Sequence, residues 1–163
     1  MPMMDHRHRR AKIIDALATM FEALKAPVEE SGFPIQVMTV QKRFAHWAAL
    51  HKQNALPAIL LRYGSGSAPD SDVVGFIDEQ LPIAVTAAMV ETQEKALTDQ
   101  ASDIHFSIGS LINANPTLGV EGVNPDRTGI MNWQPDLQLG YSKFEVIRFN
   151  VLVVHRYHAS EDV

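Results

Sequence analysis

Hydrophobic residues near the start of the chain recur with the period of an α-helix. Between residues 6 and 24 they are Ile13, Ile14, Leu17, Met20, Phe21 and Leu24. With 3.6 residues per turn these positions form one apolar stripe, and polar residues fall on the opposite side. The pattern predicts an amphipathic helix over 6–24, with Asp5 as its N-cap and Pro27 just beyond its end.

Three shorter apolar segments are typical of β-strands. They are residues 35–40, 57–63 (PAILLRY) and 81–90 (LPIAVTAAMV). The last two begin at or beside a proline, where the missing backbone N–H costs a strand least. Between the first two, residues 42–52 place Phe44, Trp47 and His51 on one helical face, which favours a short helix or an irregular segment.

A second helix and a long final strand follow. The helix is expected to start near Thr92 and to end at Asn113–Pro116, with an apolar stripe of Leu97, Ala101, Ile104, Ile108, Leu111 and Ile112. Residues 144–157 (FEVIRFNVLVVHRY) alternate with a period of two. The set that carries the apolar weight is expected to face the core, and it comprises Glu145, Ile147, Phe149, Val151, Val153, His155 and Tyr157.

Two stretches rich in turn residues separate these elements. Residues 64–75 (GSGSAPDSDVVG) predict a loop that is mobile in the isolated subunit, and 117–142 predict a long segment with one strand around 120–131. The order helix, strand, strand, strand, helix, strand, strand favours one α+β domain over 1–163, with a flexible basic N-terminus at 1–8. We expect a four- to five-stranded, mostly antiparallel sheet with two amphipathic helices packed on one face.

Composition narrows the class of protein. The chain has 163 residues, of which 46% are hydrophobic and 20% charged, as in an ordinary globular domain. It has no cysteine, so disulfides, thiolate zinc sites, iron–sulfur clusters and cysteine nucleophiles are excluded. No apolar run approaches the roughly 20 residues of a membrane helix, and the basic N-terminus lacks the apolar segment of a secretory signal. A cytosolic place of synthesis is the expectation.

The motifs of common enzymes are absent. Gly64-Ser65-Gly66 is followed by Pro69 and acidic residues, which do not suit a dinucleotide phosphate. The histidine spacings do not put two ligands on one helical face, and no nucleophile elbow occurs. We therefore predict no catalytic, cofactor-binding or metal-binding residues. A small ligand-binding or metal-dependent enzyme, with a site assembled from Asp103, His105 and His155, stays open as a distant alternative.

Charge is distributed unevenly along the chain. Residues 1–62 carry nine Lys and Arg against five Asp and Glu, whereas 63–163 carry five against fourteen. The first half is thus +4 and the second −9, which suits a head-to-tail oligomer but also fits chance placement of solvated charges. The basic run is Arg7, Arg9, Arg10 and Lys12, and the candidate partner-contact loop is Asp70, Asp72, Asp78 and Glu79.

The ordered features resemble the tail terminator family of tailed bacteriophages. The resemblance rests on the opening helix, the strand LPAILLRYGSG, the strand LPIAVTAAMV, the helix and its exit ALTDQASDIHFSIGSLINANPTLG, and the final strand FEVIRFNVLVVHRY. It runs in order over roughly residues 8–157. Its motifs are patterns of elements rather than catalytic signatures.

The resemblance implies a structural virion protein at the junction of tail and neck, assembled in the host cytoplasm. Its subunits would form a hexameric ring that caps the tail tube, stops tail polymerisation and docks to the head-side neck. The implied partners are further copies of the chain, the tube protein, a neck or connector protein and, in contractile-tailed phages, a sheath protein, with genomic DNA passing through the channel and no membrane. Arg7, Arg9, Arg10 and Lys12 would then lie on the inner rim or against an acidic neighbour. Another head–tail connector or neck completion protein is the alternative.

Overall fold

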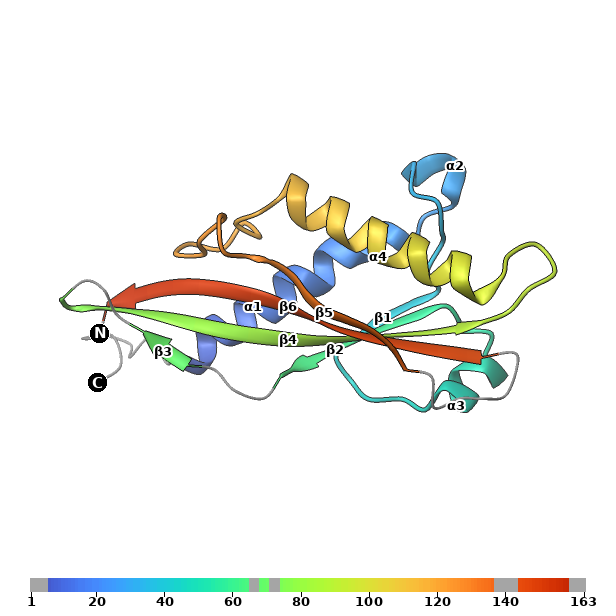
Figure 1. The fold of residues 1–163 in the computed structure, drawn as a ribbon, viewed down its shortest axis with the longest axis horizontal. Helices are drawn as coiled ribbons and strands as arrows, with labels where there is room; N and C mark the ends of the chain where they lie inside the picture. Colours follow the sequence, from blue (N-terminus) through green and yellow to red (C-terminus); the bar gives the residue numbers. More distant parts are fainter. Residues whose placement is uncertain (1–5, 65–67, 71–73, 137–143, 159–163) are drawn as a thin grey trace.

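A long antiparallel pair of strands forms the centre of the molecule (Figure 1). The computed structural model describes residues 6–64, 68–70, 74–136 and 144–158. The central strands are β4 (Phe76–Val90) and β6 (Phe144–His158), which pair along their whole length. Around them lie β1 (Thr39–Gln41), β2 (Ala58–Tyr63) and β5 (Gly129–Asp136), in the order β1-β2-β4-β6-β5. The short β3 (Ala68–Asp70) pairs with β4 off this path.

The chain has the predicted α+β fold, with a mixed and mostly antiparallel five-stranded sheet. Only β1 and β2 run parallel. The helical segments are α1 (His6–Phe21), the 3-10 turn η1 (Glu22–Lys25), α2 (Val28–Ser31), α3 (Trp47–Lys52) and α4 (Leu97–Ala114). The long helices α1 and α4 cover the same face of the sheet, as expected, whereas α3 lies beside the other face (Figure 1).

The main core lies between this sheet face and the two long helices. The odd-numbered side chains of β4 and β6 point into it, because alternate residues of a strand face opposite sides. The hydrophobic residues that the two strands contribute to this core are Leu81, Ile83, Val85, Ala87, Met89, Ile147, Phe149, Val151 and Val153. The helices contribute Ile13, Leu17 and Phe21 from α1 and Ile104, Ile108 and Ile112 from α4. The predicted core side of the final strand is therefore confirmed.

The start of α4 differs from the predicted position. The helix begins at Leu97 rather than near Thr92, because Thr92 and Lys95 close a turn ahead of it. The Lys95 backbone N–H donates to Thr92 Oγ1, and the Gln100 side chain donates to the Val90 and Lys95 carbonyls. These bonds satisfy backbone groups that a longer helix would have used itself.

The predicted strand at 120–131 is displaced toward the C-terminus. The structure has a strand at Gly129–Asp136, and before it only Val123 forms an isolated bridge, to His155. Gly122 explains the close approach of this segment to β6. Its φ is +86°, and a Cβ there would lie 2.5 Å from the Arg156 carbonyl oxygen. Only glycine fits such a contact without displacing the backbone.

Three further expectations need correction. Residues 64–75 are not a loop throughout, because Ala68–Asp70 form β3. The mobility expected for this segment concerns mainly 65–67 and 71–73, which lie outside the described residues. The N-terminus is already helical at residues 6–8, although Asp5 is outside the described part. The first strand spans 39–41 instead of 35–40, since the backbone before it bonds to Leu24 and Pro57 instead of a strand ladder.

Candidate functional site

The residues of the alternative enzyme site have separate partners. Lys95 pairs with Asp103, the His105 ring lies edge-on to Phe149 with centroids 6.0 Å apart, and His155 contacts Glu79. Burial lowers the pKa of His105 below its usual range. Among the described residues, no three His, Asp or Glu side chains gather closely enough to hold a metal ion. No helix in the same part of the chain is long and apolar enough to cross a membrane.

A buried ion cluster joins the basic run to the acidic segment. Glu79 is 1% exposed, and its Oε1 lies 2.5 Å from Arg10 Nη2. Its Oε2 lies 3.4 Å from Nε2 of His155, which is 2% exposed and directly opposite in the β4–β6 register. Both strand residues point to the helix-covered face, and Arg10 reaches Glu79 from α1. The carboxylate therefore sits between two nitrogen-bearing groups at the edge of the core.

A second ion pair occupies the opposite face at the same level of the sheet. Arg156 donates from Nε and Nη2 to the two carboxylate oxygens of Asp78, at 2.7 and 2.8 Å. These hydrogen bonds hold the pKa of the Asp78 carboxyl below its usual range, against the smaller opposing effect of burial. Arg9 donates from Nη1 to the Arg156 carbonyl at 3.2 Å, and its guanidinium lies 5.5 Å from the Tyr157 ring centroid.

These contacts revise the predicted partner residues. Asp78 and Glu79 lie in β4, not in a loop, and Glu79 is buried, so it offers no surface to another protein. Arg9 and Arg10 have contacts within their own chain, while Lys12 is exposed. Asp70 lies opposite Asp78 in the β3–β4 register. Asp72 and the side chain of Arg7 lie outside the described residues. The alternation Ile77, Glu79, Leu81 already indicated that Glu79 faces inward.

The other face of the sheet contains a pocket of about 240 Å³. It lies between residues 43–47 and strands β2, β4 and β6, with Leu60, Ala88 and Val146 among its apolar lining. This open face, opposite α1 and α4, is hollow because β4 presents the small residues Ala84, Thr86 and Ala88 to it. Only α3 covers one end, where Leu50 packs in a small cluster with Ala58, Ala88 and Val146.

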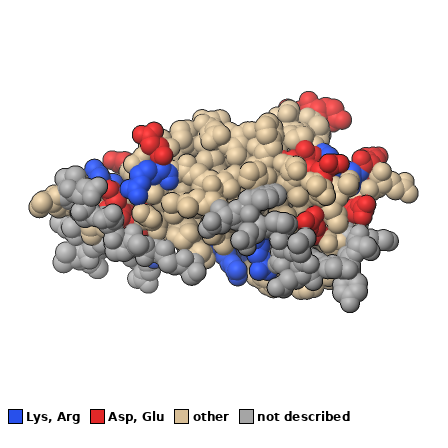
Figure 2. All heavy atoms as spheres, in the orientation of Figure 1, with Lys and Arg blue, Asp and Glu red and all other residues tan. Residues whose placement is uncertain are grey.

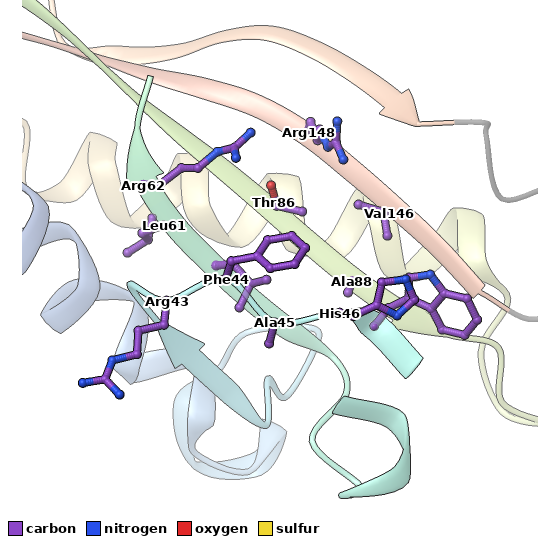
Figure 3. A pocket seen from close by; sticks show the side chains of 12 residues that line it. Arg43, Phe44, Ala45, His46, Leu61, Arg62, Thr86, Ala88, Val146 and Arg148 are labelled. Atoms are coloured by element: carbon purple, nitrogen blue, oxygen red, sulfur yellow. The ribbon is translucent and has the colours of Figure 1, made fainter. Parts of the chain in front are cut away.

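Three arginines and a phenylalanine surround this pocket, and we call Arg43, Phe44, Arg62 and Arg148 the arginine–phenylalanine surface. Phe44 is 80% exposed, and Figure 3 shows its ring over the strands, with Arg62 and Arg148 on either side of Thr86. Arg43 extends on the other side of the ring. None of the pocket's described lining residues is acidic, so the surface is cationic around an apolar floor.

Sequence reasoning did not single out these residues. It placed Phe44 on a helical face with Trp47 and His51, but α3 begins only at Trp47, after the cap residue His46. The Ala48 backbone N–H donates to His46 Nδ1 at 3.2 Å, which ends the helix on that side. Phe44 therefore precedes the helix and projects. The basic residues near Phe44 in the sequence, Arg43 before it and His46 after it, were the available signal for this surface.

A groove of opposite charge lies in the helix layer. Its volume is about 410 Å³, and its lining includes Val28 of α2, Pro34, and Glu94 and Lys95 from the turn before α4, with the Lys95 ammonium paired to Asp103. Glu29 and Glu30 are exposed on the same single-turn helix as Val28. We call Val28, Glu29, Glu30 and Glu94 the acidic groove. Figure 2 shows acidic side chains gathered at this end of the molecule.

Comparison with known proteins assigns no relative to this chain. No protein-family model matches it, and no curated protein matches its sequence.

Proposed function

We propose that this chain is a structural subunit of a phage tail, similar to a tail terminator, and that its copies form a ring that caps the tail tube. The ring, hexameric by resemblance, ends tube polymerisation and presents a surface for the head-side neck. The order of elements along the chain supports this proposal, since it follows the pattern on which the resemblance rests. The exposed surfaces described above also support the proposal, and it requires no reaction centre.

One observation carries the proposal: in the part of the chain that the structure describes, long helices cover the sheet on one face only. On the open face Phe44 is 80% and Met131 46% exposed, beside the apolar pocket. Exposed apolar groups next to arginines are characteristic of surfaces that bind protein. A subunit that contacts neighbours in a ring and a tube below it needs surfaces of this kind.

Size is consistent with a ring. A 163-residue globule has a radius of gyration of about 15 Å, so one copy does not enclose a DNA duplex. Several copies around an axis leave a channel, which genomic DNA needs at the junction of tail and neck. The proposed partners are other copies of the chain, the tube protein, a neck or connector protein and, in contractile tails, the sheath protein.

The test is reconstitution with a phage tail tube protein. Native mass spectrometry and negative-stain microscopy of the purified chain should show rings with a central hole. Added to polymerising tube protein, the rings should bind one tube end and shorten the tubes in proportion to their concentration. A monomer that neither binds nor shortens tubes would overturn the proposal. Rings that bind the connector but leave tube length unchanged would favour a neck completion protein instead.

A further inference from the structure

Two surfaces of opposite charge lie on opposite layers of the same subunit. We infer that the arginine–phenylalanine surface of one copy binds the acidic groove of the next copy. This inference rests on the proposed function, because it specifies the contact between neighbours in the ring. Its occupant is a second copy of this chain, and its recognition chemistry is the guanidinium groups of Arg43 and Arg62 against three carboxylates around an apolar centre.

Charge complementarity is the first argument. Glu29, Glu30 and Glu94 are exposed, and within the described part of the chain none of them forms an ion pair. Arg43 and Arg62 are exposed in the same way on the open face. The charges of Arg43 and Arg62, and those of the three glutamates, are therefore available to a neighbour. Complementary charges of this kind steer association and fix the register of two partners.

Apolar fit is the second argument. Phe44 projects from the open face, while the acidic groove is lined by Val28, Pro34 and Leu56 among other residues. Val28 is itself 42% exposed at the edge of the groove. An aromatic side chain that fills an apolar pocket on the partner, with charged groups around it, is a common arrangement of an interface hot spot.

Placement in the fold is the third argument. The arginine–phenylalanine surface belongs to the face that α1 and α4 leave open, and the acidic groove lies in the helix layer, at α2 and the start of α4 (Figure 1). Contacts between two different surfaces of identical subunits are head-to-tail, and they close into a ring when the rotation between subunits permits. A symmetric pair through the open faces would instead bring like-charged arginines together, which disfavours it.

The apolar floor favours a protein partner over DNA. Non-specific contacts to a DNA backbone are made by cationic groups on phosphates and need no apolar pocket. Leu60, Ala88 and Val146 form such a pocket directly below the arginines. DNA binding by this surface is therefore the outcome to be excluded by the test.

The experiment uses charge reversal on each surface in the full chain. Arg43→Glu with Arg62→Glu, and separately Glu30→Arg with Glu94→Arg, should each raise the subunit dissociation constant about tenfold or more in native mass spectrometry. An equal mixture of the two variants should form rings again. In that mixture the two unchanged surfaces meet in one interface and the two reversed surfaces meet in the next, so opposite charges are paired in both. Arg127→Glu with Lys52→Glu reverses two exposed charges elsewhere and should leave assembly unchanged.

A photo-crosslinker in place of Phe44 identifies the partner directly. It should join to a neighbouring copy within residues 28–36 or 90–95. Rings that form normally from both reversed variants, or a crosslink to the tube protein or to DNA, would overturn the inference while leaving the proposed function intact. Failure of the unmodified chain to form rings or to cap tubes is the different result that overturns the proposed function. Thermal unfolding of each variant confirms that it is folded.

Discussion

The two faces of the central sheet are built from the same strands but differ in composition. On β4, Leu81, Ile83 and Val85 point to the helix layer and are buried, whereas Ala84 and Thr86 point to the open face. Burial of large aliphatic side chains contributes about 1.5–3 kcal/mol each, so the helix-covered face supplies most of the stability. The open face contributes less to folding and retains side chains that a partner can contact.

The same contrast holds for polar side chains at the far end of the sheet. Glu79 and His155 form one cross-strand pair on the covered face, and Asp78 and Arg156 form the next on the open face. Arg10 reaches Glu79 from α1. Removing a partner from a buried pair leaves a desolvated charge, whereas an exposed pair exchanges with water. Neighbouring positions therefore have different energetic roles, and matched substitutions can separate them.

The largest difference is expected between Val151 and Leu152. Val151→Asp buries an unpaired charge in the core and should cost several kcal/mol, enough to unfold a domain of ordinary stability of about 5–15 kcal/mol. Leu152→Asp, one residue later on the open face, should cost about 1 kcal/mol or less. Urea unfolding followed by circular dichroism compares the two. Equal losses would show that the open face is as buried as the core.

A smaller difference is expected between the two carboxylates of β4. Glu79→Gln should destabilise the fold by about 3 kcal/mol, at the low end for a buried ion pair because the Arg10 guanidinium is partly exposed. Asp78→Asn should cost about 1 kcal/mol or less. Thermal unfolding at neutral pH measures both. A Glu79→Gln protein as stable as the original chain would mean that the cluster is dispensable.

Acid should remove the contribution of Asp78. Its pKa is lowered in the folded state, so the carboxylate stabilises the fold above the ordinary carboxyl pKa of about 4 and loses that contribution as the pH falls through the lowered value. The stability difference between the original chain and Asp78→Asn should therefore shrink below about pH 4. Urea unfolding at pH 6, 4 and 3 tests this. A difference that is constant with pH would contradict it.

The smallest effect on stability is expected at Phe44. Phe44→Ala should change the free energy of unfolding by no more than about 0.5 kcal/mol, because the side chain is largely exposed. Phe21→Ala, in the core, should cost about 3–5 kcal/mol through the cavity it leaves. Calorimetry of both variants gives the comparison. A large loss at Phe44 would mean that this residue supports the fold of its own subunit.

Local periodicity made much of the fold predictable. The apolar stripes of α1 and α4 and the inward set of β6 were predicted because burial follows the 3.6- and 2-residue periods directly. Boundaries were less predictable: α4 starts late because side chains of Thr92 and Gln100 bond the preceding backbone. The strand β4 extends back to Phe76, which places two supposed loop residues in a strand.

The sequence by itself determined the α+β class, the two long helices and the side of the final strand that is buried. Those features depend on neighbours a few residues apart, whose spacing is written in the chain. Only the tertiary structure decided that Arg10 and His155 both meet Glu79, and that Phe44 lies near Arg62 and Arg148. These groups are distant in sequence. A local hydrophobic pattern indicates whether a residue is buried, but it does not indicate which element packs against it.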